Sequence, residues 1–189
     1  MGSSGSKYLP HSVASRLRGF TILEVVTVIV IIAILATMLL PIYSSFTARA
    51  EEARCLANLR NLYVAASGYL QADGSWPQIP AKLIIDDPKT YAKSWVAALA
   101  PYGIAHSTWI CPTLQHTFGT SMDSLEKTEN YRIDFIAAPF DDNPASPRND
   151  PNHPWFIEKA GVHPRGNLLI LANGTTTSLL DLTGKTLGK

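Results

Sequence analysis

The longest apolar run of the chain extends from Phe20 to Ile42 and contains Glu24 as its single charged residue. The next charge along the chain is Arg49. As a helix this run would be roughly 34 Å long, compared with about 30 Å for the hydrocarbon core of a bilayer. The pattern therefore predicts a helix that is long and apolar enough to span a membrane once.

The same helix is predicted to continue as an amphipathic segment with one apolar face. Apolar residues recur at spacings of three and four from Phe46 to Leu70, with polar residues between them. Pro41 removes one backbone hydrogen bond and is expected to kink the helix rather than end it. The helix should stop near Asp73 and Gly74, and Pro77 should prevent a restart. The predicted apolar face consists of Phe46, Ala50, Ala53, Leu56 or Ala57, Leu59, Tyr63, Ala66 and Leu70.

The residues after Gly74 predict a region of mixed secondary structure. Lys89 to Leu99 has the pattern of a short amphipathic helix, and Trp109 to Pro112 that of a short strand or turn. Asn173-Gly174 is a two-residue hairpin signature between the last two predicted strands. The fold class is therefore predicted as α+β, with a long N-terminal helix packed on a small C-terminal antiparallel sheet. The predicted strands are Asn130–Ala137, Trp155–Lys159, Asn167–Ala172 and Thr175–Leu180.

Charge adds an orientation to this picture. The chain of 189 residues is 46% hydrophobic and 16% charged, with a net charge of +1, and no basic patch indicates a nucleic-acid partner. Residues 1–19 carry only positive charges, at Lys7, Arg16 and Arg18. The charges that follow the apolar run are balanced. The positive-inside rule therefore places the N-terminus in the cytoplasm and the C-terminal region outside the inner membrane.

Glu24 needs a physical explanation. An ionised carboxylate in the bilayer interior costs on the order of 2.5–3.5 kcal/mol, so such a residue normally faces a partner rather than lipid. The alternative is that Glu24 only lies at the headgroup boundary.

Gly19-Phe20-Thr21-Ile22-Leu23-Glu24, after a short basic leader and before the apolar run, resembles the class III signal of type IV pilins and type II secretion pseudopilins. The resemblance implies that a prepilin peptidase cuts between Gly19 and Phe20 and methylates the new amino group of Phe20. It also implies that Glu24 pairs with the Phe20 amino terminus of a neighbouring subunit, which would fix the axial register. The implied domains are a leader (1–19), a transmembrane half-helix (20–43), a soluble half-helix (44–73) and a periplasmic head (74–189).

The implied function is that of a non-enzymatic structural subunit of a type IV pilus-like or type II secretion pseudopilus fibre. Its expected partners are other pilins or pseudopilins, the peptidase and an inner-membrane assembly platform. It would be a single-pass inner-membrane protein before assembly and part of a fibre afterwards. The alternative is a membrane-anchored or secreted binding module that does not polymerise. An ordinary secretory signal cleaved after Ala50 would also release a soluble protein, but the apolar run is longer than the usual 7–15 residues.

A second resemblance covers the C-terminal region. His163 followed by Asn173-Gly174 looks like the His-x9-Asp-Gly pattern of a bacterial pseudopilin-like group, which also shows counterparts of Cys55-Leu56-Ala57-Asn58-Leu59, Cys111-Pro112 and Glu158-Lys159. Asn173 replaces the aspartate of that pattern. A role that needs a charge there is in doubt, whereas a role in turn geometry is retained because Asn tolerates positive φ.

Other candidate sites leave alternatives open. Cys55 and Cys111 either pair as a disulfide, as an oxidising compartment would allow, or remain buried thiols. Asp141, Asp142 and Asp150 either ligate calcium or form a solvated acidic loop. No other cofactor or metal is expected. A zinc site or thiol nucleophile at His106, Cys111 and His116 lacks a further ligand or base at motif spacing, and Gly184-Lys185-Thr186 lacks the earlier glycine and following helix of a phosphate loop.

Overall fold

The computed structural model describes residues 19–127, 129–140 and 147–186, and describes no side chains at 39–42, 44, 185 and 186. The chain divides into an N-terminal unit, Met1–Tyr43, and a C-terminal unit, Ser44–Lys189. Helix α1 (Ile22–Asp73) contributes to both units. Most of the predicted leader, residues 1–18, lies outside the described residues.

Helix α1 ends where the sequence predicts. Gly74 has a φ of 72° and its N–H donates to the carbonyl of Leu70, 3.1 Å away, which forms a left-handed C-terminal cap. The helix continues through Pro41, as expected, while the bend at that residue stays a prediction.

The predicted apolar face of α1 is correct only in its second half. Leu59, Ala66 and Leu70 are buried, but Phe46 is 64% exposed. The prediction is also wrong for Ala50 and Ala53, which are exposed, whereas Leu56, one of the two alternatives Leu56 and Ala57, packs on the core. The buried row begins at Cys55. Spacing alone could not mark this boundary, because it depends on how far along α1 the core of the C-terminal unit extends. The buried residues of α1 are Cys55, Leu59, Leu62, Ala65, Ala66 and Leu70.

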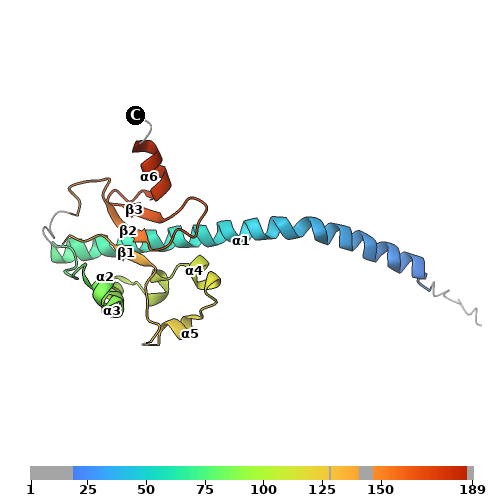
Figure 1. The fold of residues 1–189 in the computed structure, drawn as a ribbon, viewed down its shortest axis with the longest axis horizontal. Coiled ribbons are helices and arrows are strands. Elements are labelled where there is room, and N and C mark those ends of the chain that lie inside the picture. The colour runs from blue at the N-terminus through green and yellow to red at the C-terminus, as the bar shows by residue number, and fades with distance from the viewer. Residues whose placement is uncertain (1–18, 128, 141–146, 187–189) are drawn as a thin grey trace, which may run out of the picture. The chain divides into compact units, whose positions relative to one another are not determined.

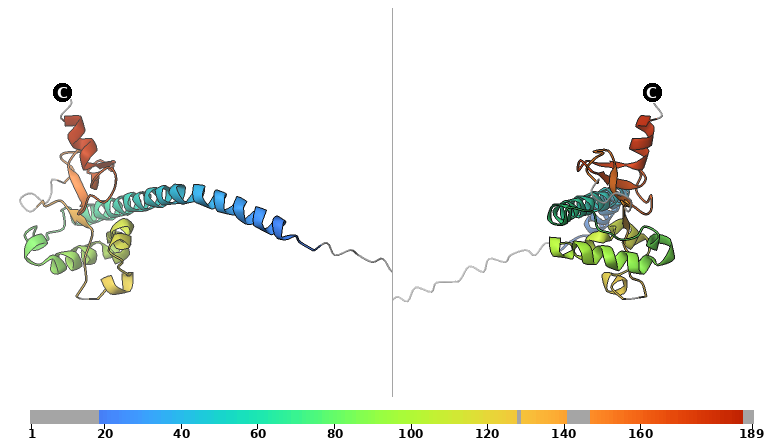
Figure 2. Two further views of the ribbon diagram at one scale, coloured as in Figure 1. Left: turned by 45° about the vertical axis from the view of Figure 1, so that its right-hand side comes forward. Right: turned by 90° about the vertical axis from the view of Figure 1, so that its left-hand side faces the viewer.

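A four-stranded antiparallel sheet in the order β1-β2-β3-β4 completes the α+β fold and confirms the predicted class. Each strand pairs with its neighbour in sequence, with an irregularity between Pro154 and Phe156. Figures 1 and 2 show the sheet crossing the C-terminal part of α1, with β3 and α6 on one side and α2 and α3 on the other. The strands are β1 (Phe135–Ala137), β2 (Pro154–Glu158), β3 (Leu168–Leu171) and β4 (Thr176–Ser178).

Short helices connect these elements. The predicted helix at Lys89–Leu99 is confirmed as α3 (Pro88–Leu99). The predicted strand at Asn130–Ala137 is too long, because only its last three residues pair with β2. The others are α2 (Leu83–Asp86), η1 (Ala100–Tyr102), η2 (His106–Trp109), α4 (Pro112–Thr117), α5 (Met122–Leu125) and α6 (Leu179–Thr186).

Of the two alternatives predicted for Trp109–Pro112, a short strand or a turn, the structure rules out the strand: Trp109 ends a 3₁₀ helix, and Cys111 is the N-cap residue of α4. The last predicted strand, Thr175–Leu180, is too long: β4 stops at Ser178, and α6 begins at Leu179. Both segments are short, so neighbouring structure decides their conformation rather than local propensity.

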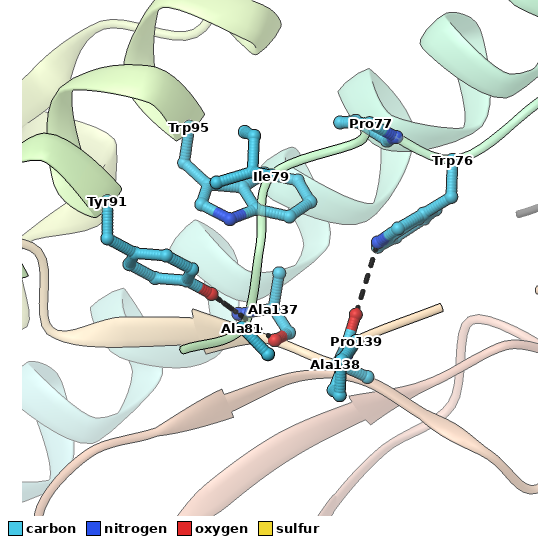
Figure 3. Close-up of a pocket in the computed structure, with 9 residues that line it drawn as sticks. All are labelled: Trp76, Pro77, Ile79, Ala81, Tyr91, Trp95, Ala137, Ala138 and Pro139. Carbon is cyan, nitrogen blue, oxygen red and sulfur yellow. Dashed lines mark hydrogen bonds between the residues drawn. The ribbon is translucent and has the colours of Figure 1, made fainter. Parts of the chain in front are cut away.

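Two aromatic side chains cover the free edge of β1 (Figure 3). The Tyr91 hydroxyl lies 3.3 Å from both the N and the O of Ala137, and Trp76 Nε1 donates to the carbonyl of Ala138 at 3.1 Å. An unpaired strand edge is prone to pair with another chain. These contacts therefore occupy the end of this edge, at Ala137 and Ala138, and connect it to α3 and to the loop after α1.

Candidate functional site

The predicted assembly residues lie at the start of α1. Thr21 is the N-cap residue: its N–H and hydroxyl both donate to Glu24 Oε2 at 2.9 Å, and the Glu24 N–H donates to Thr21 Oγ1 at 3.2 Å. This reciprocal arrangement is a capping box. Glu24 therefore has a partner within its own chain, which the sequence analysis did not anticipate. Gly19 and Phe20 precede the helix, and Phe20 is 85% exposed.

The N-terminal part of α1 presents apolar side chains at almost every position. From Val25 to Met38 the large apolar residues are between 47% and 64% exposed. Thr27 and Thr37 donate their hydroxyl protons to the carbonyls of Leu23 and Ile34, at 2.6 and 2.7 Å. A helix that is apolar on all sides is normally buried in lipid or protein. The hydroxyls of Thr27 and Thr37 do not oppose such burial, because their hydrogen bonds are made within the helix.

None of the helices formed by the described residues meets the length and apolar content that crossing a bilayer requires.

A second candidate site lies in the C-terminal unit and combines residues from four places in the sequence. Cys55 of α1, Cys111 before α4, Glu158 at the end of β2 and His163 in the following loop are all buried. One potential ligand atom from each lies within 4.8 Å of the others. We call these four residues the buried cluster. Both cysteines are free thiols. Of the two alternatives predicted for Cys55 and Cys111, the structure therefore shows buried thiols that lie close together, not a disulfide.

His163 contacts two other members of the buried cluster. Its Nε2 lies 3.6 Å from Cys111 Sγ and 3.2 Å from Glu158 Oε1. Burial by itself lowers the pKa of His163, but its contacts with Cys111 and Glu158 outweigh burial and raise that pKa. The neighbouring Cys55 thiol and burial raise the pKa of Cys111, so this thiol is not an activated nucleophile.

Surrounding hydrogen bonds hold the members of the buried cluster in place. The second carboxylate oxygen of Glu158 accepts from the Leu168 N–H at 3.3 Å, and the Glu158 carbonyl accepts from Asn167 Nδ2 at 2.8 Å. The N–H of Cys111 donates to Asp134 Oδ2 at 3.0 Å. Each of these contacts orients a cluster residue without occupying the atom that faces the other three. The cluster is therefore anchored to β3 and to the segment before β1.

Asn173 and Gly174 form the turn between β3 and β4. The predicted two-residue hairpin is corrected to a longer turn, in which the Gly174 N–H donates to Leu171 and the Leu171 N–H to Thr175, both at 2.9 Å. Positive φ occurs at Gly174, at 80°, and not at Asn173. Asn173 instead accepts from the Thr175 N–H through Oδ1 at 2.9 Å, which an aspartate could also do.

The remaining candidates do not form a site among the described residues. Asp141 and Asp142 lie outside those residues, and Asp150 accepts from the Asn152 N–H at 2.9 Å as a local turn. His106 stacks on Tyr131, with ring centroids 4.1 Å apart. His116 is exposed and lies 3.8 Å from Glu51. Neither histidine belongs to the buried cluster with Cys111.

Sequence reasoning missed the buried cluster as a unit. It treated the two cysteines as a pair, His163 as part of a turn motif and Glu158 as a detail of the resemblance. One feature of the sequence could have pointed to the cluster: all four residues lie in the segments that resemble the pseudopilin-like group. Their sequence separation gives no local pattern, so only the fold brings them together.

Comparison with known proteins finds a family motif in the N-terminal segment and similarity to type IV pilins over part of the chain. A family model described as the prokaryotic N-terminal methylation motif matches residues 15–40. The type IV major pilin protein PilE1 of Neisseria gonorrhoeae is 36% identical over 61 residues, which are 32% of this chain and 37% of that protein. The fimbrial protein of Neisseria meningitidis serogroup B (strain ATCC BAA-335 / MC58) is 37% identical over 60 residues, 32% of this chain and 35% of that protein.

A pilin from another organism gives a similar result. The type IV major pilin protein PilA of Myxococcus xanthus (strain DK1622) is 39% identical over 54 residues, 29% of this chain and 24% of that protein. The chain thus spans about a third or less of the length of these relatives. No solved structure matches.

Proposed function

We propose, from the premise that the chain is type IV pilin-like, that it serves as a structural subunit of a type IV pilus-like or type II secretion pseudopilus fibre. The main support for this proposal is the N-terminal part of α1. This segment matches the methylation motif, and its large apolar side chains are exposed. Exposed apolar surface of this extent marks an interaction site with lipid or protein. Side-by-side packing of this helix with its copies would bury that surface in a fibre.

Processing would precede assembly. A prepilin peptidase would cut between Gly19 and Phe20 and methylate the Phe20 amino group. The proposed location before assembly is the bacterial inner membrane, with an assembly platform as a further partner. The proposed location rests on the apolar run from Phe20 to Ile42. The same chain would then leave the membrane to join a fibre of other pilins or pseudopilins.

Glu24 would gain a second interaction partner on assembly. In the single chain its carboxylate accepts both bonds from Thr21. In a fibre surrounded by apolar helices, the amino group of Phe20 on a neighbouring chain would supply a positive charge as well. The bonds from Thr21 to the ionised carboxylate bring no positive charge, whereas the amino group would neutralise the carboxylate where burial makes an unpaired charge costly. This ion pair would therefore favour the register in which Glu24 of one chain meets the amino terminus of its neighbour.

Mass spectrometry of the chain produced together with a prepilin peptidase tests the processing step. We expect a mature polypeptide that begins at Phe20 and carries one added methyl group. Gly19→Ala should leave the precursor uncut, because the site before the cut no longer fits the peptidase. Gly5→Ala changes another glycine of the leader and should be processed normally. A mature chain that begins at Glu51 would instead favour the secreted binding module.

The two sides of the capping box separate a local from an intersubunit role of Glu24. Thr21→Ala and Glu24→Ala both break the cap, which typically costs about 0.5–2 kcal/mol of helix stability. Only Glu24→Ala removes the proposed partner of Phe20. We expect Glu24→Ala to be processed but absent from sheared fibres, while Thr21→Ala assembles. Equal assembly of the two variants would show that Glu24 acts as a helix cap alone.

A further inference from the structure

We propose that the buried cluster binds one Zn²⁺ ion as a closed structural site. The cluster supplies two sulfurs, one imidazole nitrogen and one carboxylate oxygen, all from buried side chains. Closure by four protein ligands is typical of structural zinc sites, whereas a catalytic site keeps one position open for water, and sulfur, imidazole nitrogen and carboxylate oxygen are all zinc ligands. Thiolates also favour zinc over calcium or magnesium, which prefer oxygen ligands.

Two distances within the cluster fit a common tetrahedral centre. With Zn–S near 2.3 Å and Zn–N near 2.0–2.1 Å, a sulfur and a nitrogen at the tetrahedral angle are about 3.5 Å apart. The observed separation of Cys111 Sγ and His163 Nε2 is 3.6 Å. A nitrogen and an oxygen ligand would be about 3.4 Å apart, and His163 Nε2 lies 3.2 Å from Glu158 Oε1. Little movement of Cys111, His163 and Glu158 would therefore be needed to bind the ion, and the Cys55 sulfur lies within 4.8 Å of their ligand atoms.

Hydrogen bonding alone explains the cluster less well. His163 Nε2 faces both a sulfur and a carboxylate oxygen, but one N–H can point with good geometry at only one of them. A buried His–Glu ion pair contributes little net stability, because the free-energy cost of desolvating both groups offsets their attraction. Thiols are weak hydrogen-bonding partners. A cation between the four atoms would contact all of them at once.

The contacts around the cluster resemble the support of a metal site. Ligating residues are usually held by outer hydrogen bonds that fix their orientation. Here Glu158 is held by Leu168 through the carboxylate oxygen that does not face His163. Cys111 is held through its backbone by Asp134. The ion would join α1, the segment before α4, the end of β2 and the loop after it, so its binding would stabilise the C-terminal unit.

Metal analysis of the full chain, purified without chelators from cells grown with zinc, tests this proposal. We expect about one Zn²⁺ per chain, and Co²⁺ in its place should show the visible absorption of a tetrahedral site with thiolate ligands. Removal of the ion with a chelator should lower Tm, and Zn²⁺ should restore it where Ca²⁺ does not. These measurements use the unaltered sequence, so they do not depend on the folding of a variant.

Variants identify the ligands. Cys111→Ser and His163→Gln should reduce the bound zinc from about one ion per chain to a small fraction of that. His116→Gln removes an exposed imidazole outside the cluster and should keep the full content. Two results would overturn the proposal: a native chain that holds no zinc and gains no thermal stability from it, or a Cys55–Cys111 disulfide found after alkylation without reductant. Zinc content is measured without reference to fibre formation, so the two proposals fail separately.

Discussion

Gly174 combines two constraints on a single residue. Its φ is 80°, and an added Cβ would lie 3.3 Å from the ring of Tyr63, whose hydroxyl donates to the Ala172 carbonyl at 3.0 Å. The turn after β3 therefore packs directly on α1. This contact gives a structural reason for the glycine of the predicted turn motif.

Gly174→Ala should destabilise the C-terminal unit for both reasons. The left-handed conformation costs a residue with a Cβ about 1–2 kcal/mol, and displacement of Tyr63 adds to that cost. Gly103 provides a matched control, because its φ is 83° but an added Cβ would meet no atom within 4 Å. We expect urea denaturation to show a larger loss of unfolding free energy for Gly174→Ala than for Gly103→Ala. Equal losses would show that the Tyr63 contact is unimportant.

At the level of elements, helix α3 depends on a polar cap at its start and an apolar face along its length. Asp87 is the N-cap residue: Oδ1 accepts from the Thr90 N–H at 3.1 Å and Oδ2 from the Thr90 hydroxyl at 2.6 Å. Tyr91 and Trp95 then lie buried against the rest of the core. The cap therefore supports an element that carries part of the aromatic core.

Acid should loosen the start of α3. The hydrogen bonds from Thr90 lower the pKa of Asp87, because they stabilise its ionised form. A lowered pKa contributes stability that is complete above the ordinary value of about 3.9 and is lost as the pH falls through the lowered pKa. Hydrogen exchange at Thr90 and Tyr91 should show this loss, and Asp87→Ala should show it already at neutral pH. Asp123→Ala, in the first turn of α5, should leave α3 protection unchanged.

At the level of the whole molecule, the chain separates an apolar helical segment from a folded C-terminal unit with its own core. These two parts should respond independently to substitution. Ile32 in the apolar segment is 58% exposed, and Ile85 in α2 is 85% exposed. A new charge at either position therefore has little effect on the core.

Ile32→Asp and Ile85→Asp should consequently differ in assembly and agree in folding. A charge in the apolar segment costs about 2.5–3.5 kcal/mol in a bilayer interior, or roughly a hundredfold in an equilibrium. We expect sheared fibres to lose Ile32→Asp and to retain Ile85→Asp, with similar Tm values for the C-terminal unit. Normal incorporation of Ile32→Asp would contradict assembly through the apolar segment.

The sequence by itself determined the features that depend on neighbours along the chain. The segment that matches the methylation motif (15–40), the helix end at Gly74 and the presence of a turn at Gly174 depend on consecutive or closely spaced residues, although the turn is longer than the two-residue hairpin predicted. Capping, chain reversal and helix formation are governed by such local interactions. The α+β class was predictable for the same reason.

Only the tertiary structure decided which distant residues meet. The buried row of α1 begins at Cys55 rather than Phe46 because packing, not periodicity, sets its limit. Short apolar segments such as Trp109–Pro112 have no decisive local preference and adopt what their neighbours allow. The buried cluster requires closure of loops between Cys55, Cys111 and His163, and loop closure leaves no repeating signal in the sequence. Its chemistry therefore becomes visible only when the sheet and α1 enclose it.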